Sequence, residues 1–174
     1  METLVVVKSI HHKNTEKIAS AFAEVLDAQI KTPEQINPEE LQEYSLIGFG
    51  SGIYGSKHHK GLLDLADKLP HVTNKKAFIF STHGAPFSFF EKIGEDMAEE
   101  IAEKMDKDHL LLREKLQSKG YTIVKEFSCP GFNTNKFLKL FGGLNKGRPN
   151  VDDLKHAKQF ALDLKQNLQT DIIQ

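Results

Sequence analysis

The sequence predicts an α/β fold in which a parallel β-sheet is covered by helices on both faces. Short runs of β-branched and other apolar residues, typical of strands buried on both sides, recur along the chain. Between them lie longer stretches whose apolar residues repeat at helical spacing. Strands that alternate with helices form a parallel sheet through right-handed crossovers, so we expect a doubly wound arrangement.

Five strands are expected. They are Leu4–Val7, Ala28–Lys31, Leu46–Gly50, Ala77–Thr82 and Tyr121–Cys129. The helices are expected around the apolar positions of 18–26, 62–69, 93–116 and 154–168. We expect Asn14 or Thr15 to cap the first of these helices, and Pro70 to stop the second. The third is expected to end at Gly120, and its sequence leaves open a break near Asp106–Asp108.

The remaining segments are shorter or irregular. Pro38-Glu39-Glu40 is typical of the start of a short helix. The stretch Pro130–Pro149 has four glycines and no clear period, and Asn150 then caps the last helix. Because no repeat, low-complexity tract or linker divides the chain, we expect residues 1–174 to form one domain.

Composition excludes several classes of protein. A chain of 174 residues with 39% hydrophobic and 27% charged residues can bury a full core, so disorder is not expected. A formal net charge of -1 gives no reason to expect nucleic acid or an anionic membrane as a partner. Cys129 is the only cysteine, which excludes an intrachain disulfide and suits a reducing compartment. With no signal peptide or membrane-spanning stretch in the sequence, we expect a cytoplasmic protein.

Three loops are expected to lie together, because ligands of such sheets bind beyond the carboxyl ends of the strands. These loops are Ser9–Thr15, Ser51–Lys57 and Ser81–Pro86. They share hydroxyl groups, glycines and histidines, and none of them contains Asp or Glu. This edge of the sheet is therefore the expected binding site.

The first loop has the features of a phosphate site. It joins a buried strand to a helix N-terminus, where free N–H groups and the helix dipole favour an anion. Ser9, Asn14 and Thr15 add hydrogen-bond donors and Lys13 adds a positive charge. The alternative, that Ser9 and Thr15 only cap the helix, remains equally open on this loop alone. The glycines of GxxxxGK[ST] and GxGxxG loops are absent.

The three loops together resemble those of the flavodoxin family. Asn14-Thr15 matches the end of a hydroxyl-rich phosphate loop that closes in Gly-Asn-Thr, although Lys13 replaces the usual glycine and His12 stands near a usual threonine. Gly50–Gly55 is similar to the loop that lays an aromatic ring against the flavin, and Ser81–Gly84 to the loop on its other side. The end of the chain, from Cys129 to Asn150, resembles an uncharacterised subgroup.

This resemblance covers nearly the whole chain and implies a fold and a function. It implies a five-stranded flavodoxin-like sheet of order 2-1-3-4-5 that binds flavin mononucleotide (FMN). It also implies a soluble redox carrier, monomeric or homodimeric, that serves redox partner proteins, with reductase and acceptor left open. The implied FMN-binding residues are Ser9, His11, His12, Lys13, Asn14, Thr15, Gly52, Ile53, Tyr54, Gly55, Ser81, Thr82, His83 and Gly84. No catalytic residue is assigned.

A flavin also requires aromatic or apolar walls. Tyr54, in a glycine-flanked loop of a chain without Trp, is the best candidate to stack on the ring. Phe87, Phe89 and Phe90 could form the other wall, although ordinary core packing is favoured for Phe89 and Phe90.

Histidines in these loops suggest a second function, a metal-dependent hydrolase. The loops lack the carboxylates that usually complete such a site, so we disfavour it and expect His58 and His59 on an exposed helix start. His11, His12 or His83 would instead bind the phosphate or the flavin edge, and His83 could tune the charge of the ring.

Two further alternatives remain. One is a non-catalytic partner-binding module, suggested by eight acidic and three basic residues in 91–108. The other is an FMN-dependent oxidoreductase of the quinone reductase or porphyrinogen oxidase type, with Pro130–Pro149 as a substrate lid. A carrier is favoured over an enzyme, and Cys129 is expected to be a buried strand residue rather than a nucleophile.

Overall fold

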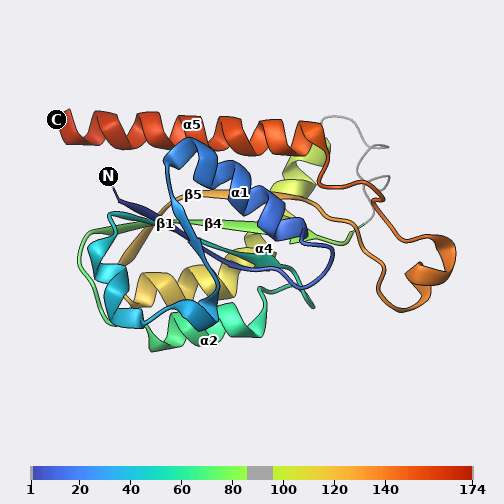
Figure 1. Ribbon diagram of the computed structural model, residues 1–174, viewed down its shortest axis with the longest axis horizontal. Coiled ribbons are helices and arrows are strands. Elements are labelled where there is room, and N and C mark those ends of the chain that lie inside the picture. The colour runs from blue at the N-terminus through green and yellow to red at the C-terminus, as the bar shows by residue number, and fades with distance from the viewer. Residues whose placement is uncertain (1, 86–95, 174) are drawn as a thin grey trace.

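Residues 2–85 and 96–173 are described by the computed structural model (Figure 1). Five strands form one parallel sheet of order β2-β1-β3-β4-β5. They are β1 (Thr3–Lys8), β2 (Gln29–Lys31), β3 (Leu46–Gly52), β4 (Lys75–His83) and β5 (Tyr121–Pro130). The predicted doubly wound five-stranded sheet is therefore confirmed.

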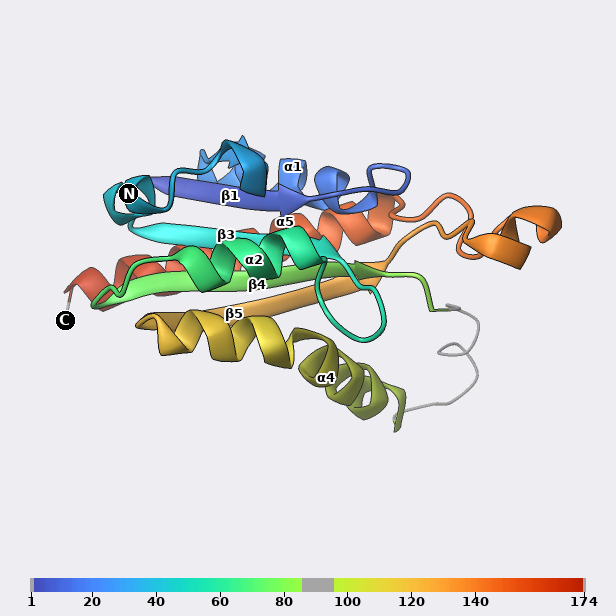
Figure 2. The same ribbon diagram turned by 90° about the horizontal axis from the view of Figure 1, so that it is seen from below.

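Helices cover both faces of this sheet (Figures 1 and 2). They are α1 (Asn14–Leu26), α2 (Lys60–Lys68), α4 (Asp96–Ser118) and α5 (Val151–Ile173), with 3₁₀ turns η1 (Pro33–Gln35), η2 (Pro38–Glu43) and η3 (Lys136–Phe141). Helices α1 and α5 lie on one face, and α2 and α4 on the other. None of the described helices combines the length and apolar composition needed to cross a membrane.

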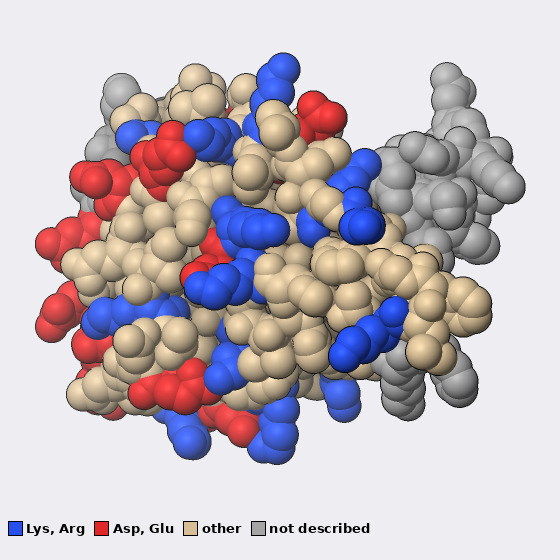
Figure 3. All heavy atoms as spheres, turned by 45° about the vertical axis from the view of Figure 1, so that its right-hand side comes forward, with Lys and Arg blue, Asp and Glu red and all other residues tan. Residues whose placement is uncertain are grey.

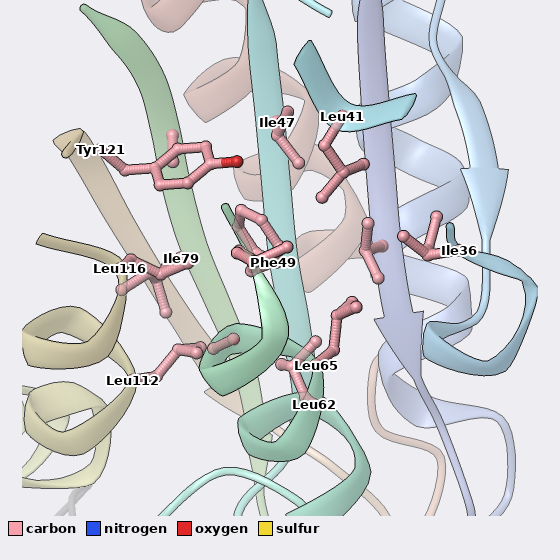
Figure 4. Close-up of a cluster of buried hydrophobic side chains, with 14 of the residues drawn as sticks. Ile36, Leu41, Ile47, Phe49, Leu62, Leu65, Ile79, Leu112, Leu116 and Tyr121 are labelled. Atoms are coloured by element: carbon pink, nitrogen blue, oxygen red, sulfur yellow. The ribbon is translucent and has the colours of Figure 1, made fainter. Parts of the chain in front are cut away.

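Each face of the sheet has its own core. Figure 4 shows the cluster under α2 and α4, in which Phe49 and Ile79 from the strands meet Leu62, Leu112 and Leu116 from the helices. The other core is aromatic. Phe22 of α1 lies with its ring centroid 5.1 to 5.5 Å from those of Phe78, Phe80, Phe127 and Phe160.

Two glycines of β3 make room for the aromatic core. A Cβ atom on Gly48 would lie 2.3 Å from Cζ of Phe78, and one on Gly50 would lie 2.2 Å from Cζ of Phe80. Real Cβ atoms do not come this close to carbon. Glycine is therefore required at both positions so that the rings can lie flat against the strand.

The ends of the helices differ in part from prediction. The expected cap of α1 by Asn14 or Thr15 is wrong, because the N-cap residue is Lys13 and makes no side-chain capping bond. Helix α4 runs through Asp106–Asp108 without a break. The Asn150 cap of α5 is confirmed, since its Oδ1 accepts from the N–H of Asp153 at 3.0 Å.

Candidate functional site

A pocket lies at the carboxyl end of the sheet, on the right in Figure 1, between the segments that follow β1, β3, β4 and β5. The first three are the loops predicted to meet at this edge. The lining residues are Ser9, Ile10, His11, Asn14, Thr15, Gly52, Ile53, Tyr54, Thr82, His83, Gly84, Gly131, Phe132, Asn133 and Asn135.

The turn from β1 into α1 is unusual. His12 and Lys13 both have left-handed backbones, with φ of 52° and 54°. This conformation costs non-glycine residues about 1–3 kcal/mol each and is found mainly at functional sites. Lys13 stands where the resembling phosphate loops have glycine, and its left-handed backbone explains why glycine suits the position. The turn brings the N-terminus of α1 to the pocket.

Polar groups without partners collect at this helix end. The first N–H groups of any helix lack intrahelical acceptors. Here the N–H of Asn14 donates to the carbonyl of His11 at 3.2 Å, and no side-chain cap satisfies the N–H groups that follow it. Among the described residues, neither Ser9 Oγ nor Asn14 Oδ1 has a hydrogen-bond partner, although both atoms are buried. Thr15 Oγ1 lies 2.8 Å from Thr82 Oγ1, so this hydroxyl joins the first loop to the third rather than capping α1. The N-terminal N–H groups of α1 and the Ser9 hydroxyl can donate to an anion, whereas Asn14 Oδ1 can only accept a hydrogen bond.

The fourth wall of the pocket comes from the segment after β5. Asn14 Nδ2 donates to the carbonyl of Phe132 at 2.8 Å, and a Cβ on Gly131 would lie 2.8 Å from the same nitrogen. Similarly, a Cβ on Gly84 would lie 2.4 Å from Nδ2 of Asn133. Both glycines therefore let this segment approach the first and third loops closely.

Tyr54 closes another side of the pocket. Its loop turns through Gly55 and Ser56, both with positive φ. The Tyr54 ring lies between His11 and His59, with ring centroids 5.9 and 5.5 Å away, and burial raises the pKa of the phenol. The aromatic group is thus held at the rim by two imidazoles.

His83 lines the pocket from the end of β4. Burial, together with the positive charge of Lys104, lowers the pKa of His83 to about 4 although Asp108 and Asp153 oppose the shift. The ring is therefore neutral near pH 7, with one nitrogen as donor and the other as acceptor.

The structure brings ten of the fourteen residues expected to bind FMN to this pocket and places four elsewhere. His12 turns away, with Nε2 2.7 Å from Thr134 Oγ1. Lys13 is exposed and pairs with Glu16, and Gly55 is exposed on its turn. Ser81 is fully buried below the pocket floor. The flavin walls suggested for Phe87, Phe89 and Phe90 lie outside the described residues.

Sequence reasoning missed the lining residues Ile10, Gly131, Phe132, Asn133 and Asn135. The last four follow the carboxyl end of β5, so the rule that identified the other three loops applied to them as well. The irregular composition of Pro130–Pro149 had concealed this.

Two of the histidines differ in their surroundings. The prediction of an exposed His58 is wrong, since its side chain is 1% exposed, whereas His59 accepts from the N–H of Gly61 at the start of α2. In residues 2–85 and 96–173 no group of three His, Cys, Asp or Glu side chains is placed to hold a metal ion. Cys129 is a buried strand residue, as predicted, and burial raises the pKa of its thiol.

Comparison with known proteins agrees with this fold. The family model described as a flavodoxin domain matches residues 4–127, so the chain belongs to the flavodoxin family. It is similar to an uncharacterised protein of Methanocaldococcus jannaschii, with 48% identity over 169 residues that cover 96% of this chain and 100% of that protein.

Solved flavodoxins share the fold at low sequence identity. Oxidised flavodoxin 2 from Bacillus cereus matches with a TM-score of 0.67 and 18% identity, covering 96% of this chain and 99% of that one. A flavodoxin from the domain Archaea matches with a TM-score of 0.61 and 17% identity over 97% and 99%. The Fusobacterium nucleatum flavodoxin bound to flavin mononucleotide matches with a TM-score of 0.61 and 14% identity, covering 96% of this chain and 99% of that one.

Proposed function

We propose that this chain binds FMN noncovalently in the four-walled pocket and carries electrons as a redox carrier. The observation that carries the proposal is the uncapped N-terminus of α1, beside the unpartnered and buried Ser9 Oγ. A phosphate there would accept hydrogen bonds from the free N–H groups and from Ser9. Family membership and the FMN-bound relative support the same ligand.

The other residues of the pocket fit the remainder of such a ligand. Glycines at positions 52, 84 and 131 let the walls of the pocket come close together, and Tyr54 offers an aromatic face at the rim. Neutral His83 can exchange hydrogen bonds with a polar ring edge. FMN would supply the one- and two-electron chemistry, and this chain would bind, orient and shield it.

The test compares the binding of FMN with the binding of riboflavin, which has the same ring system but no phosphate. We expect a yellow protein whose released chromophore has the mass of FMN, and tighter binding of FMN than of riboflavin. Ser9→Ala should weaken FMN binding about tenfold, because it removes a hydrogen bond to a charged group, and should leave riboflavin binding unchanged. An exposed serine far from the pocket, Ser118→Ala, serves as control. A protein that takes up no added FMN would refute the proposal.

The segment around η3 is the part we propose to meet redox partners. It projects beyond the sheet near the pocket (Figures 1 and 2) and ends in Leu140 and Phe141, which are 79% and 84% exposed. Lys139 and Lys146 are exposed beside them, and neither pairs with a described carboxylate. Figure 3 shows basic side chains across the middle of this end of the molecule. An apolar tip with basic flanks suits a partner with an acidic surface.

Electron exchange with an acidic ferredoxin, followed by stopped flow, tests this surface. Phe141→Ser should slow the exchange about tenfold without altering FMN affinity, because the residue lies outside the pocket. Leu162→Ser, a partly exposed apolar residue on α5, is the control. Equal rates for the two variants would exclude the tip as the docking site.

An FMN-dependent oxidoreductase is the second candidate. A hollow of about 500 Å³ adjoins the pocket and shares His83 with it. Phe127, Cys129 and Pro130 line it together with charged side chains of both signs, so it offers apolar and charged groups to a substrate. The charged residues are Arg148, Lys155, Asp152 and Asp153, of which Arg148 and Asp153 pair with each other. Direct turnover of NAD(P)H with a quinone, or oxidation of a porphyrinogen, would favour the enzyme over the carrier.

A further inference from the structure

Three serines lie side by side directly beneath the pocket. Ser51 of β3 pairs in register with Ser81 of β4, which pairs with Ser128 of β5. The Oγ atoms of Ser81 and Ser128 are 2.9 Å apart. The next residues along β3 and β4, Gly52 and Thr82, line the pocket. A polar row is therefore built into the sheet one residue below the proposed flavin site.

Two buried histidines cover this row. His58, from the loop after β3, and His109, from α4, are 1% and 0% exposed, with ring centroids 4.9 Å apart. His109 Nε2 lies 2.8 Å from Ser81 Oγ, and His58 Nδ1 lies 2.9 Å from Ser51 Oγ. The imidazoles thus join the helical layer to the serine row.

A partly buried carboxylate, that of Glu126, fixes the orientation of His109. Its Nδ1 lies 2.7 Å from Glu126 Oε2, and Arg113 donates to both oxygens of the same carboxylate. Burial alone would raise the pKa of Glu126, but the bonds from His109 and Arg113 outweigh it and bring it to about 2. Ionised Glu126 can only accept, so Nδ1 of His109 carries the hydrogen and, in the neutral ring, Nε2 accepts from Ser81.

Ser81, His109 and Glu126 are hydrogen-bonded in the same order as the serine, histidine and carboxylate of a hydrolytic triad. Ser81 is 0% exposed, however, and its hydroxyl is already engaged with Ser128. A nucleophile needs access to its substrate, so this set of residues serves a structural purpose.

The hydrogen bonds around Ser51 fix the tautomer of His58. The Ser51 hydroxyl donates to the carbonyl of Gly52 at 2.8 Å and accepts from the N–H of His59 at 2.9 Å. With its single hydrogen directed to Gly52, the bond to His58 is donated by Nδ1 of the imidazole, and this tautomer avoids a buried N–H on Nε2 with no acceptor. Nε2 of His58 is buried and has no hydrogen-bond partner among the described residues. Protonation of Nε2 would make the imidazole positively charged, and no described residue would accept a hydrogen bond from the new N–H.

These bonds anchor the loop that presents Ile53 and Tyr54 to the pocket. The loop is closed by an antiparallel bridge between Ile53 and His58 and by a 2.8 Å bond from the N–H of Tyr54 to the carbonyl of Lys57. Its beginning and its end therefore meet at the Ser51 hydroxyl. Movement of His58 would release both.

We propose that His58 and His109 act together as positioning residues of the flavin site, that they hold the 53–57 loop through Ser51, and that protonation of His58 loosens this loop. The proposal rests on FMN binding for its functional consequence, but the anchoring itself belongs to the apoprotein. It assigns a role to two buried histidines that do not touch the pocket.

The sign of the pH effect follows from the buried groups. Burial and the neighbouring His109 hold the pKa of His58 well below its ordinary 6.5. The closed loop therefore binds fewer protons than a loosened one, and FMN affinity should fall as pH drops below about 6.5, by at most tenfold per pH unit. Among the described residues, His109 of α4 is the titratable group that faces His58. Glu126 of β5 contacts His109, Arg113 of α4 contacts Glu126, and both stay ionised over that range.

Two substitutions of His58 separate its hydrogen bond from its titration. His58→Leu removes the donor to Ser51 and should weaken FMN binding at least tenfold near pH 7.5. His58→Asn offers an amide donor that does not titrate, so it should keep affinity within about threefold of the wild type near pH 7.5 and abolish the weakening below pH 6.5. His71→Asn, at an exposed histidine, is the control.

A second readout needs no flavin. In the apoprotein, His58→Leu should accelerate hydrogen exchange of the Tyr54 amide about tenfold or more, and NMR should show His58 with its hydrogen on Nδ1. Unchanged Tyr54 exchange in the folded His58→Leu protein, or a His58→Asn protein with the pH dependence of the wild type, would overturn the proposal. If the wild type binds no FMN, the proposed function fails, while the exchange experiment still tests the anchoring.

Discussion

Gly50→Ala tests how closely the aromatic core is packed against β3. The added Cβ would lie 2.2, 2.3 and 2.5 Å from three carbons of the Phe80 ring, where ordinary contacts are about 3.5–4.0 Å. The ring must therefore move by more than about 1 Å. It has no free space to enter, because Phe80 is 0% exposed and Phe22 lies against it at 5.1 Å. Overpacking of this kind costs about 1–3 kcal/mol, and we expect about 3 kcal/mol here.

Urea unfolding followed by circular dichroism measures this cost. With a slope of about 1–3 kcal/mol per molar urea, a cost of about 3 kcal/mol should lower the unfolding midpoint of Gly50→Ala by about 1–3 M. In a Phe80→Leu background the same change should cost less than about 1 kcal/mol, because the clashing ring is gone. Gly61→Ala is the control, since the nearest atom to its Cβ would be His59 Nδ1 at 3.3 Å. A cost below about 0.5 kcal/mol, or one unaltered by Phe80→Leu, would refute the reasoning.

Three further outcomes are expected. The pKa of Glu126 is about 2, below its ordinary 4.5, so ionised Glu126 stabilises the fold above pH 4.5, and this stabilisation is lost as the pH falls towards 2. Glu126→Gln should therefore be most destabilising near pH 7. In urea unfolding, the difference between its free energy of unfolding and that of the wild type should become smaller below pH 4.5. Asp153→Ala, which removes the acceptor of Arg148 and the Asn150 N–H, should lower the free energy of unfolding by about 2 kcal/mol, and a loss under 0.5 kcal/mol would contradict this. Cys129 should react with a thiol reagent only at the rate of unfolding, and fast labelling of the native protein would show that its burial is misjudged.

The fold was largely predictable because its signals are local. Each strand is a short apolar run. These runs alternate with segments whose apolar residues repeat at helical spacing, and this order predicts a parallel sheet with crossover helices on both faces. Three of the four pocket walls followed from the same rule, since parallel strands place all their carboxyl ends at one edge. The prediction that Cys129 is a buried residue of the last strand was also confirmed, because it too depended on a local apolar pattern.

The site itself depended on contacts between distant segments. Nothing near Lys13 in the sequence reveals that it adopts a left-handed backbone and leaves α1 uncapped. His58 reads as the start of a surface helix, yet it is buried because His109, 51 positions later, lies against it. Assignment of the FMN-binding residues remains a prediction, to be tested by the Ser9 variant.

The sequence by itself determined the order of strands and helices, the edge of the sheet where the pocket lies and the hydroxyl-rich composition of that edge, because these depend on local periodicity and on the direction of parallel strands. Tertiary structure decided which side chains enter the pocket, that Gly131–Asn135 completes it, and that a serine row with two histidines supports it. Those features join residues from β3, β4, β5 and α4 whose separation along the chain carries no local signal.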